Sequence, residues 1–294
     1  MNIYRLIILG MSFTAFLWGT SFYLIKDLLE KISYEVLTFN RFFIATVVLG
    51  TWWITIGKRE KIAKQDRGRL IVGGLLGGAF YYILSGRATA LLPVVDLSIV
   101  SGMQPVLMML IECLIIGTLF TERESISIAL SVIGSIFLID TISTDQTLGV
   151  YILQVSATVV WAIYYFIQKP LVLKYRPTTI IFFQFLLNTL LFLPSVLMDE
   201  TFLIPLDWSL TMKLLYLGIG GSAIAYTLNS FALRKLSPTG ISLFLNAGPI
   251  INIALVWIEG KRAIGGNQIL GTVLIIVGVI LILREWKNKY KISQ

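Results

Sequence analysis

Residues 18–26 read WGTSFYLIK, and residues 161–169 read WAIYYFIQK. Each stretch closes a long apolar run, and in each a tryptophan is followed eight positions later by a lysine. When the sequence is compared with itself at an offset of 143 or 144 residues, both stretches coincide, and so do many other residues. Among them are Phe42 with Phe185, Thr46 with Thr189, Tyr82 with Tyr226, Pro105 with Pro249 and Gly134 with Gly278. The pattern predicts an internal duplication.

The composition indicates an integral membrane protein. Apolar residues make up 56% of the chain and charged residues 14%, whereas about 25% charged residues is usual for soluble domains. A helix needs about 20 apolar residues to cross a bilayer. The sequence offers ten such segments, near residues 4–25, 34–56, 70–91, 94–118, 125–140, 147–168, 178–198, 209–233, 238–259 and 267–283.

Each copy of the duplication contains five predicted helices, so the second copy enters the membrane in the opposite sense to the first. We therefore expect an all-α integral membrane fold of ten transmembrane helices, arranged as two inverted five-helix repeats. The repeats would span residues 1–140 and 144–285, followed by a basic cytoplasmic tail at residues 286–294. Inverted repeats are common in secondary transporters, because two halves of opposite sense can exchange conformations around a central site.

The positive charge is unevenly distributed over the predicted loops. With the N-terminus placed in the cytoplasm, 17 of the 24 Lys and Arg residues fall on the inner side and 5 on the outer side. Cytoplasmic loops of membrane proteins carry such an excess. We therefore expect both termini in the cytoplasm. The net charge of +8 then reflects membrane insertion and does not indicate a nucleic-acid partner.

The sequence lacks the residues that several classes of function require. The sequence contains no histidine, which removes histidine-based catalysis, histidine metal ligands and histidine proton relays. No Walker pattern for nucleotide binding occurs, and the single Cys113 excludes an internal disulfide and a thiolate metal cluster. We expect no enzyme activity, no cofactor and no metal.

Three ionisable residues fall near the outer ends of predicted helices. An intramembrane charge is costly and is a functional candidate by default. Arg41 lies seven residues into its helix, and Arg87 and Asp96 bracket the connection between the third and fourth helices. Arginine can hold a carboxylate with two parallel hydrogen bonds. The three could form an outer charged vestibule for an anionic or zwitterionic solute, or a structural ion pair at the helix ends.

Glu112 lies deeper, in the inner half of the fourth predicted helix, and has no charged counterpart in the other copy. A desolvated carboxylate can alternate between protonated and charged forms, so Glu112 is a candidate for coupling transport to a proton. The alternatives are a hydrogen-bonded glutamate without a coupling role, and one that reaches the inner interface.

Aromatic and amide side chains in the middle of the helices are candidates for lining a solute cavity, although aromatic residues also form interfacial belts. The set comprises Trp18, Tyr81, Tyr82, Trp161, Tyr164, Tyr165 and Tyr226, with Gln104, Gln184, Asn188 and Asn229. Pro105 and Pro249 each remove a helix hydrogen bond and are candidates for breaks or gates. They lie on stripes of small and polar residues, one of which contains Asn246, and such stripes also serve close helix packing.

The segments NRFF (40–43), GLLGGAFYYILS (74–85) and ALRKLSPTGISLFLNAGPI (232–250), together with WGTSFYLIK, complete a resemblance. Over nearly its whole length, the chain resembles the EamA-type carriers of the drug/metabolite transporter superfamily. The acidic residue that the family often carries after the helix prolines is replaced by Thr118 in the first copy and by Lys261 and Arg262 in the second. The role of that acidic residue is therefore not transferred to this chain.

The resemblance implies a carrier with a central cavity between helices of both copies. We expect alternating access for a small organic solute, an amino acid or related metabolite, with export as the preferred direction. The expected location is a cytoplasmic membrane, among its lipids, and the Lys, Ile and Asn usage is typical of a bacterial chain from an AT-rich genome. The alternatives are a flippase of lipid-linked or amphipathic substrates and a membrane receptor that does not transport.

Overall fold

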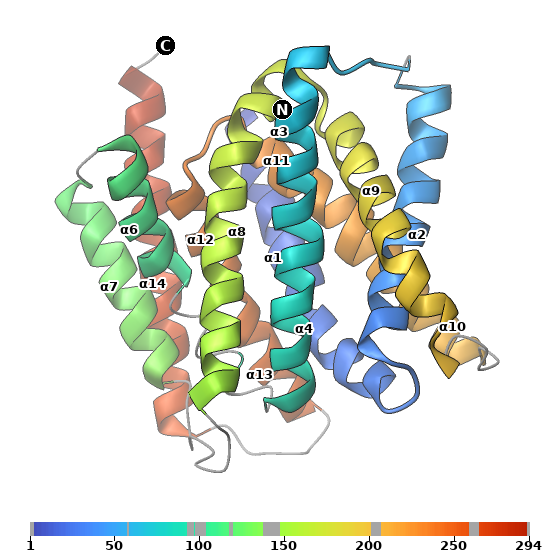
Figure 1. Ribbon diagram of the computed structural model, residues 1–294. Coiled ribbons are helices and arrows are strands. Elements are labelled where there is room, and N and C mark those ends of the chain that lie inside the picture. Colours follow the sequence, from blue (N-terminus) through green and yellow to red (C-terminus); the bar gives the residue numbers. More distant parts are fainter. Residues whose placement is uncertain are drawn as a thin grey trace.

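The computed structural model describes residues 3–57, 59–92, 97, 104–117, 120–137, 148–200, 207–258 and 265–292. Within these ranges the chain is helical and contains no strand. The helices run side by side between two ends of the molecule, and both chain ends lie at the same end (Figure 1). We call this end the termini side and the opposite end the far side.

The helices of the first half begin with α1 (Ile3–Leu29) and α2 (Tyr34–Thr55). The next apolar segment is built from α3 (Lys64–Gly74), the π-helix η1 (Leu75–Phe80) and α4 (Tyr81–Leu91). The described part of this half ends with α6 (Gln104–Ile116) and α7 (Glu122–Phe137). Residues 98–103, at the start of the predicted fourth helix, lie outside the described residues, as does Asp96.

The second half contains α8 (Leu148–Lys174) and α9 (Pro177–Leu197). They are followed by α10 (Trp208–Leu215), the π-helix η3 (Tyr216–Ile224) and α11 (Ala225–Leu233). The last helices are α12 (Pro238–Leu245), α13 (Gly248–Ile258) and α14 (Gly266–Ile292).

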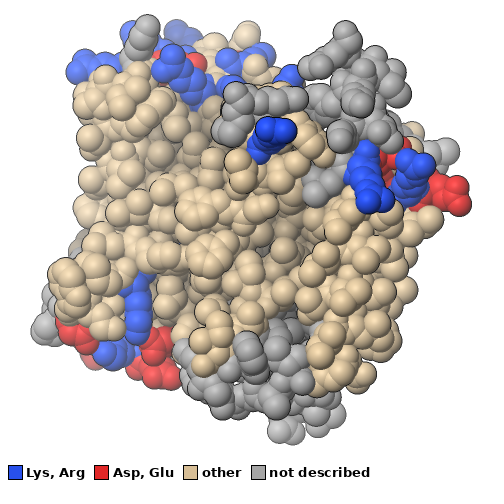
Figure 2. Space-filling model, turned by 180° about the vertical axis from the view of Figure 1, so that it is seen from behind, with Lys and Arg blue, Asp and Glu red and all other residues tan. Residues whose placement is uncertain are grey.

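Membrane-like character is clearest in the longest segments. Among the described residues, five helical segments are long and apolar enough to cross a bilayer, namely α1, α2, α3 to α4, α8 and α9. Charged side chains gather at the two ends of the face seen in Figure 2, where Lys and Arg dominate the termini side and the middle shows hardly any charged residue. The structure is therefore that of a multi-pass helical membrane protein.

Residues that coincide in the two halves of the sequence, which we call matched residues, touch each other in the interior. The rings of Trp18 and Trp161 lie 5.7 Å apart, and those of Phe42 and Phe185 lie 5.1 Å apart. The two hydroxyls of the matched pair Tyr82 and Tyr226 are 3.1 Å apart, and those of Thr46 and Thr189 are 3.2 Å apart. Contacts of this kind are what a two-fold axis between similar halves produces.

The contact between α7 and α14 is reciprocal in the same way. A Cβ atom added at Gly134 would lie 2.7 Å from the carbonyl oxygen of Gly271. One added at Gly278 would lie 2.8 Å from the carbonyl oxygen of Ser127, the residue matched to Gly271. These glycines therefore let the two backbones touch, as small residues do in membrane helix pairs.

Among the described residues, irregular helical backbone occurs at three places near the centre. The two π-helices η1 and η3 occupy matched positions in the two halves. In the second half, the predicted helix 238–259 is interrupted between Leu245 and Gly248. Pro249 has no N–H for the carbonyl of Leu245, which explains an interruption at this point.

Candidate functional site

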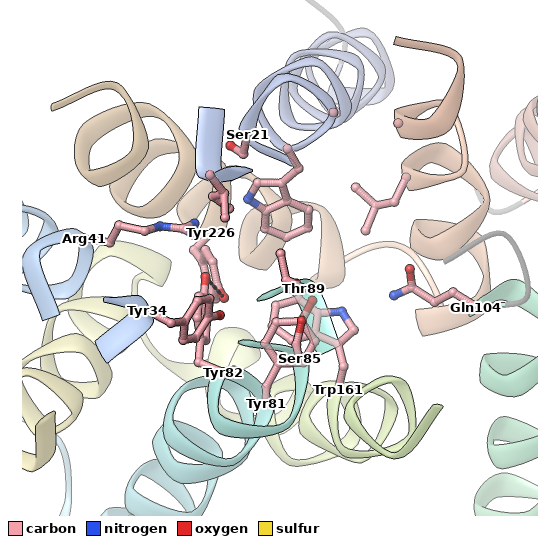
Figure 3. Close-up of a pocket in the computed structure, with 15 residues that line it drawn as sticks. Ser21, Tyr34, Arg41, Tyr81, Tyr82, Ser85, Thr89, Gln104, Trp161 and Tyr226 are labelled. Carbon is pink, nitrogen blue, oxygen red and sulfur yellow. Dashed lines mark hydrogen bonds between the residues drawn. The ribbon is translucent and has the colours of Figure 1, made fainter. Parts of the chain in front are cut away.

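The structure contains a cavity of about 120 Å³ near the centre of the molecule. Its walls come from α1, α2, α4, α6, α8 and from the α11–α13 region, so both halves of the chain contribute (Figure 3). The cavity extends from the centre toward the far side, because Ile25, Tyr34 and Thr89 are near helix ends on that side. The lining residues are Trp18, Gly19, Ser21, Ile25, Tyr34, Arg41, Tyr81, Tyr82, Ser85, Thr89, Gln104, Trp161, Tyr226, Leu245 and Gly248.

Aromatic rings form the wall of the cavity nearest the centre. The Trp161 ring lies 4.9 Å from Tyr81 and 5.5 Å from Tyr226, and Trp18 lies 5.4 Å from Tyr226. Most of these contacts are edge-to-face, an arrangement that stabilises aromatic clusters. The indole N–H of Trp18 donates to the carbonyl of Gly221 at 2.8 Å. The rings therefore make a fixed wall that can receive an apolar or cationic group.

The π-helices supply carbonyls to this wall. Gly77 in η1 and Gly221 in η3 are matched residues, and the carbonyl of each accepts a side-chain hydrogen bond, from Tyr226 at 3.4 Å and from Trp18 at 2.8 Å. The side chain of Asn188 spans η1, because it donates to the Gly74 carbonyl and accepts from the Ala79 N–H. The wider π turns thus leave backbone groups that side chains satisfy.

Arg41 supplies the positive charge of the cavity. Its side chain is 4% exposed and points from α2 toward Tyr82 and Tyr226 (Figure 3). The Nε atom donates to Ser222 Oγ at 3.4 Å, and the guanidinium carbon lies 5.2 Å from the centre of the Tyr82 ring. Among the described residues, no ion pair involves Arg41. A buried guanidinium with so few partners favours an anionic ligand such as a carboxylate.

Polar side chains fill the region between this cavity and the termini side. The amides of Gln168 and Gln184 bond each other, with the shorter contact at 2.8 Å, and the Gln168 amide also donates to Ser230 Oγ at 3.4 Å. The hydroxyl of Tyr165 donates to Asn229 Oδ1 at 3.0 Å. We call these five residues the amide cluster. All of them are buried, and none lines the cavity.

Glu112 lies on α6, where it bonds the start of α12. Glu112 is 6% exposed, and its carboxylate accepts hydrogen bonds from the backbone N–H of Thr239 at 3.1 Å and from the Thr239 hydroxyl at 2.6 Å. A carboxylate at a helix N-terminus is stabilised by the helix dipole. Nearby, the ammonium of Lys169 donates to the carbonyls of Leu233 and Leu236 at the end of α11. The geometry fits the alternative of a hydrogen-bonded glutamate, and the coupling of Glu112 to a proton stays a prediction.

The two lysines of the opening sequence pattern have similar partners. Lys26 donates to the Ala90 carbonyl near the end of α4, at 3.4 Å. Lys169, its matched residue, donates at the end of α11, the helix matched to α4. A cation near a helix C-terminus stabilises the exposed carbonyls there. The repeated lysine therefore has a helix-capping role in both halves.

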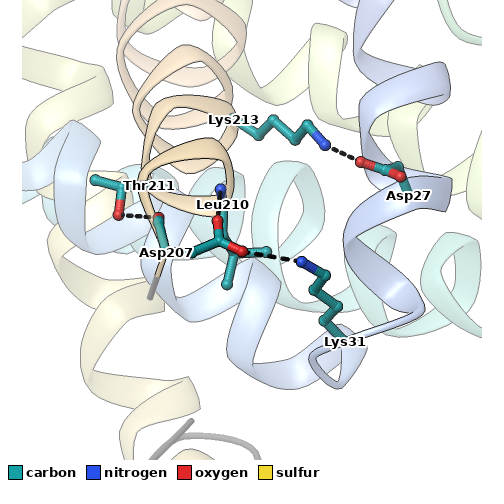
Figure 4. A network of polar contacts seen from close by, with 6 residues as sticks. All are labelled: Asp27, Lys31, Asp207, Leu210, Thr211 and Lys213. Carbon is teal, nitrogen blue, oxygen red and sulfur yellow. Dashed lines mark hydrogen bonds and ion pairs between the residues drawn. The ribbon is translucent and has the colours of Figure 1, made fainter. Parts of the chain in front are cut away.

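Two ion pairs join α1 and the turn that follows it to α10 and its N-cap residue Asp207 on the far side (Figure 4). Lys31 pairs with Asp207 at 3.0 Å, and Lys213 pairs with Asp27. Asp207 also accepts from the backbone N–H of Leu210, and this bond, together with Lys31, lowers the pKa of Asp207 below its ordinary value of 3.8. The stability that Asp207 contributes is therefore present above about pH 4 and is lost as the pH falls through the lowered pKa.

The structure brings together only part of the predicted set. Trp18, Arg41, Tyr82, Gln104 and Trp161 line the cavity. Four other predicted solute-binding residues are buried but do not line it, namely Tyr165, Gln184, Asn229 and Asn246.

The remaining candidates are separated from the cavity or fall outside the described residues. Arg87 is exposed and does not line the cavity, so the structure does not bring it to Arg41. Asp96 lies outside the described residues, so the three-residue vestibule stays a prediction. Pro105 lies in the first turn of α6, after undescribed residues. Pro249 lies in the first turn of α13, beside the cavity-lining residue Gly248.

Sequence reasoning missed the small hydroxyl residues of the cavity. Ser21, Ser85 and Thr89 line it, as does Tyr34. A signal was present, since Ser85 and Thr89 follow Tyr81 at four-residue spacing and share its helix face. Serine and threonine are frequent at helix contacts in membranes, however, so this spacing alone does not separate a cavity wall from a packed interface.

The chain is similar over nearly its whole length to proteins that are named as transporters. An "Uncharacterized transporter" of Archaeoglobus fulgidus is 23% identical over 275 residues, covering 94% of this chain and 98% of that protein. A protein of Streptantibioticus cattleyicolor, named "Probable terminal-alkyne amino-acid exporter", is 23% identical, covering 92% of this chain and 91% of that protein. A solved crystal structure superposes with a TM-score of 0.75 at 17% identity, over 95% of this chain and 96% of the other.

The family comparison gives the same result twice within the chain. The model of the EamA-like transporter family matches residues 5–140 and again residues 148–284. The two matches leave few residues uncovered, and they lie on either side of the predicted boundary between the two copies. The resemblance drawn from WGTSFYLIK and the other segments is therefore confirmed: the chain belongs to the EamA-like transporter family.

Proposed function

We propose that the protein is a secondary carrier that moves a small organic solute with a carboxylate group, an amino acid or related metabolite, across the cytoplasmic membrane by alternating access. The observation that carries this proposal is Arg41, a buried cation that lines the central cavity and takes part in no ion pair of the described residues. A solute carboxylate would supply the missing anion and could accept two parallel hydrogen bonds from the guanidinium.

The size and lining of the cavity support a small solute. Cavities for drug-sized ligands measure about 300–1,000 Å³, and the cavity here holds about 120 Å³. Hydroxyl and amide groups of Ser21, Ser85, Thr89 and Gln104 can bond polar atoms, and the tryptophan and tyrosine faces can meet an ammonium or an apolar tail. An amino-acid zwitterion offers all of these groups.

The contacts between matched residues support the inverted-repeat part of the proposal. Trp18 meets Trp161 and Thr46 meets Thr189, as expected if a pseudo-two-fold axis relates two halves of opposite sense. The excess of Lys and Arg on the termini side supports placing both termini in the cytoplasm. Export as the direction is supported by the name of the Streptantibioticus cattleyicolor relative.

The sequence suggests a proton as the coupling ion, with Glu112 as the carboxylate that would carry it. The two hydrogen bonds from Thr239 favour a structural carboxylate instead. The proposal therefore contains no proton step.

The test is solute counterflow in proteoliposomes with labelled amino acids, organic acids, nucleosides and cationic dyes. We expect saturable exchange of one carboxylate-bearing class. Arg41→Gln should raise KM for that class at least about tenfold, because a hydrogen bond to a charged group contributes about 1.5–3 kcal/mol. Arg41→Lys keeps the charge but loses the planar guanidinium, so its KM should lie between those of wild type and Arg41→Gln. Arg87→Gln is the matched control and should leave KM unchanged, because Arg87 is exposed and outside the cavity.

Other outcomes separate the alternatives. An unchanged KM in Arg41→Gln would keep a carrier but remove Arg41 from its site. Movement of a fluorescent lipid analogue without exchange of any soluble solute would indicate a flippase. Saturable binding without flux, by protein shown to be folded, would indicate a receptor.

A further inference from the structure

The cavity lies on the far side of the central aromatic wall, and residues of the amide cluster stand at matched positions on the other side. Arg41 is matched to Gln184, Ser85 to Asn229, and Ile25 to Gln168. The first member of each pair lines the cavity on the far side, and the second belongs to the amide cluster toward the termini side. We propose that the amide cluster is a second, closed half-site, which opens to the termini side and holds the carboxylate of the same solute there. This inference rests on the proposed alternating-access function.

The contacts within the amide cluster fit a site that is closed. Gln168, Gln184, Ser230 and Asn229 are 0–3% exposed, and their polar groups are satisfied mainly by each other. The exception is the amide nitrogen of Asn229, which is buried and has no hydrogen-bond partner among the described residues. A buried donor without a partner is unfavourable, and a solute oxygen could satisfy it.

The proposed half-site differs from the open cavity in charge. The guanidinium of Arg41 is replaced at the matched position by the neutral amide of Gln184, and Gln168 stands where the first half has the apolar Ile25. Amide N–H groups can donate to a carboxylate, but without the charge their hydrogen bonds are weaker. The solute should therefore bind less tightly from the termini side than from the far side. This difference changes KM on each side, whereas gradients set the direction of net transport.

The first test measures whether the amide cluster becomes accessible to water. Single cysteines are placed at Ser230 and at Ser85 in a Cys113→Ser background, and proteoliposomes receive a membrane-impermeant thiol reagent with a mixture of the common amino acids as probe. We expect Ser230→Cys to react several-fold faster when the mixture drives exchange, while Ser85→Cys reacts more slowly. Ser131→Cys, a buried position between α7 and α14, is the matched control and should stay protected.

A second variant is needed because the open conformation could be too rare in the wild type for labelling to detect it. Gln184→Leu removes the paired amide of Gln168 and should raise labelling of Ser230→Cys even without amino acids. If Ser230→Cys stays as protected as Ser131→Cys in both backgrounds, while the same vesicles exchange amino acids, the second half-site is wrong and the carrier stands. If wild-type vesicles exchange nothing, the proposed function itself fails.

The second test introduces a negative charge into the half-site. Gln184→Glu keeps the shape of the side chain but places a carboxylate where the solute carboxylate would bind. In oriented vesicles, we expect KM measured from the termini side to rise at least about tenfold and KM from the far side to rise much less. Arg41→Gln should give the opposite pattern. Equal changes on both sides in Gln184→Glu would overturn the assignment.

Discussion

Individual residues show what the sequence could and could not predict about the site. Arg41 could be singled out, because a charge inside a predicted membrane helix needs a reason. The same reasoning selected Arg87 equally, yet Arg41 is buried in the cavity wall and Arg87 is exposed. Which way a side chain faces depends on how the helices pack around it. That packing involves contacts far apart in sequence, such as Arg41 with Ser222, which no local pattern contains.

Glu112 gives a prediction at this scale. Because its carboxylate accepts two hydrogen bonds from Thr239, Glu112→Gln keeps an acceptor and should preserve both the melting temperature and the pH dependence of transport. Glu112→Leu leaves the Thr239 N–H without a partner and should destabilise the protein by about 1–3 kcal/mol. Thermal melting in detergent measures the stability of each variant, and exchange rates from acid to neutral pH measure the pH dependence of transport. Loss of the pH dependence in Glu112→Gln would instead support proton coupling.

Helices were predictable to the extent that their apolar length defines them. The predicted segment 178–198 corresponds to α9, and 34–56 corresponds to α2. The prediction was less accurate for 238–259, where Pro249 divides the segment into α12 and α13. The π-helices η1 and η3 were not predicted. Their glycine-rich sequences indicated close packing, but the extra residue per turn depends on partners such as Asn188 and Trp18 on other helices.

The contact between α7 and α14 leads to a prediction for these elements. A side chain at Gly134 would collide with the backbone oxygen of Gly271 and the backbone nitrogen of Ile275, which cannot move aside as a flexible side chain could. We expect Gly134→Leu to destabilise the protein by about 1–3 kcal/mol, a common cost of overpacking. The matched control is Gly68→Ala, an exposed helix position with no atom within 4 Å of the added Cβ, which should be neutral or slightly stabilising. Equal melting temperatures for Gly134→Leu and wild type would contradict the close contact.

For the whole molecule, the duplication predicted from sequence has a physical counterpart in the matched residues that meet. Thr46 and Thr189 lie on α2 and α9, with their hydroxyls 3.2 Å apart. In a Cys113→Ser background, Thr46→Cys with Thr189→Cys should form a disulfide under mild oxidation. With a protease site inserted between the two family domains, the cleaved halves should then stay joined on a non-reducing gel.

The matched control for this cross-link uses Thr51→Cys with Thr189→Cys. Thr51 is exposed on α2, about 7.5 Å further along the helix than Thr46, so this pair should not cross-link. Separation of the cleaved halves in the Thr46 and Thr189 variant would show that α2 and α9 do not meet at these residues.

The meeting of matched residues within one chain has a genetic consequence. In an assembly of two identical chains, every mutation alters both members of a matched pair at once. Here both members belong to one polypeptide, so a mutation alters one and leaves the other unchanged. One matched pair, Thr46 and Thr189, has the same residue at both positions, whereas another, Arg41 and Gln184, differs in charge. Selection can therefore adjust the chemistry of each half of the pathway separately, within a single gene.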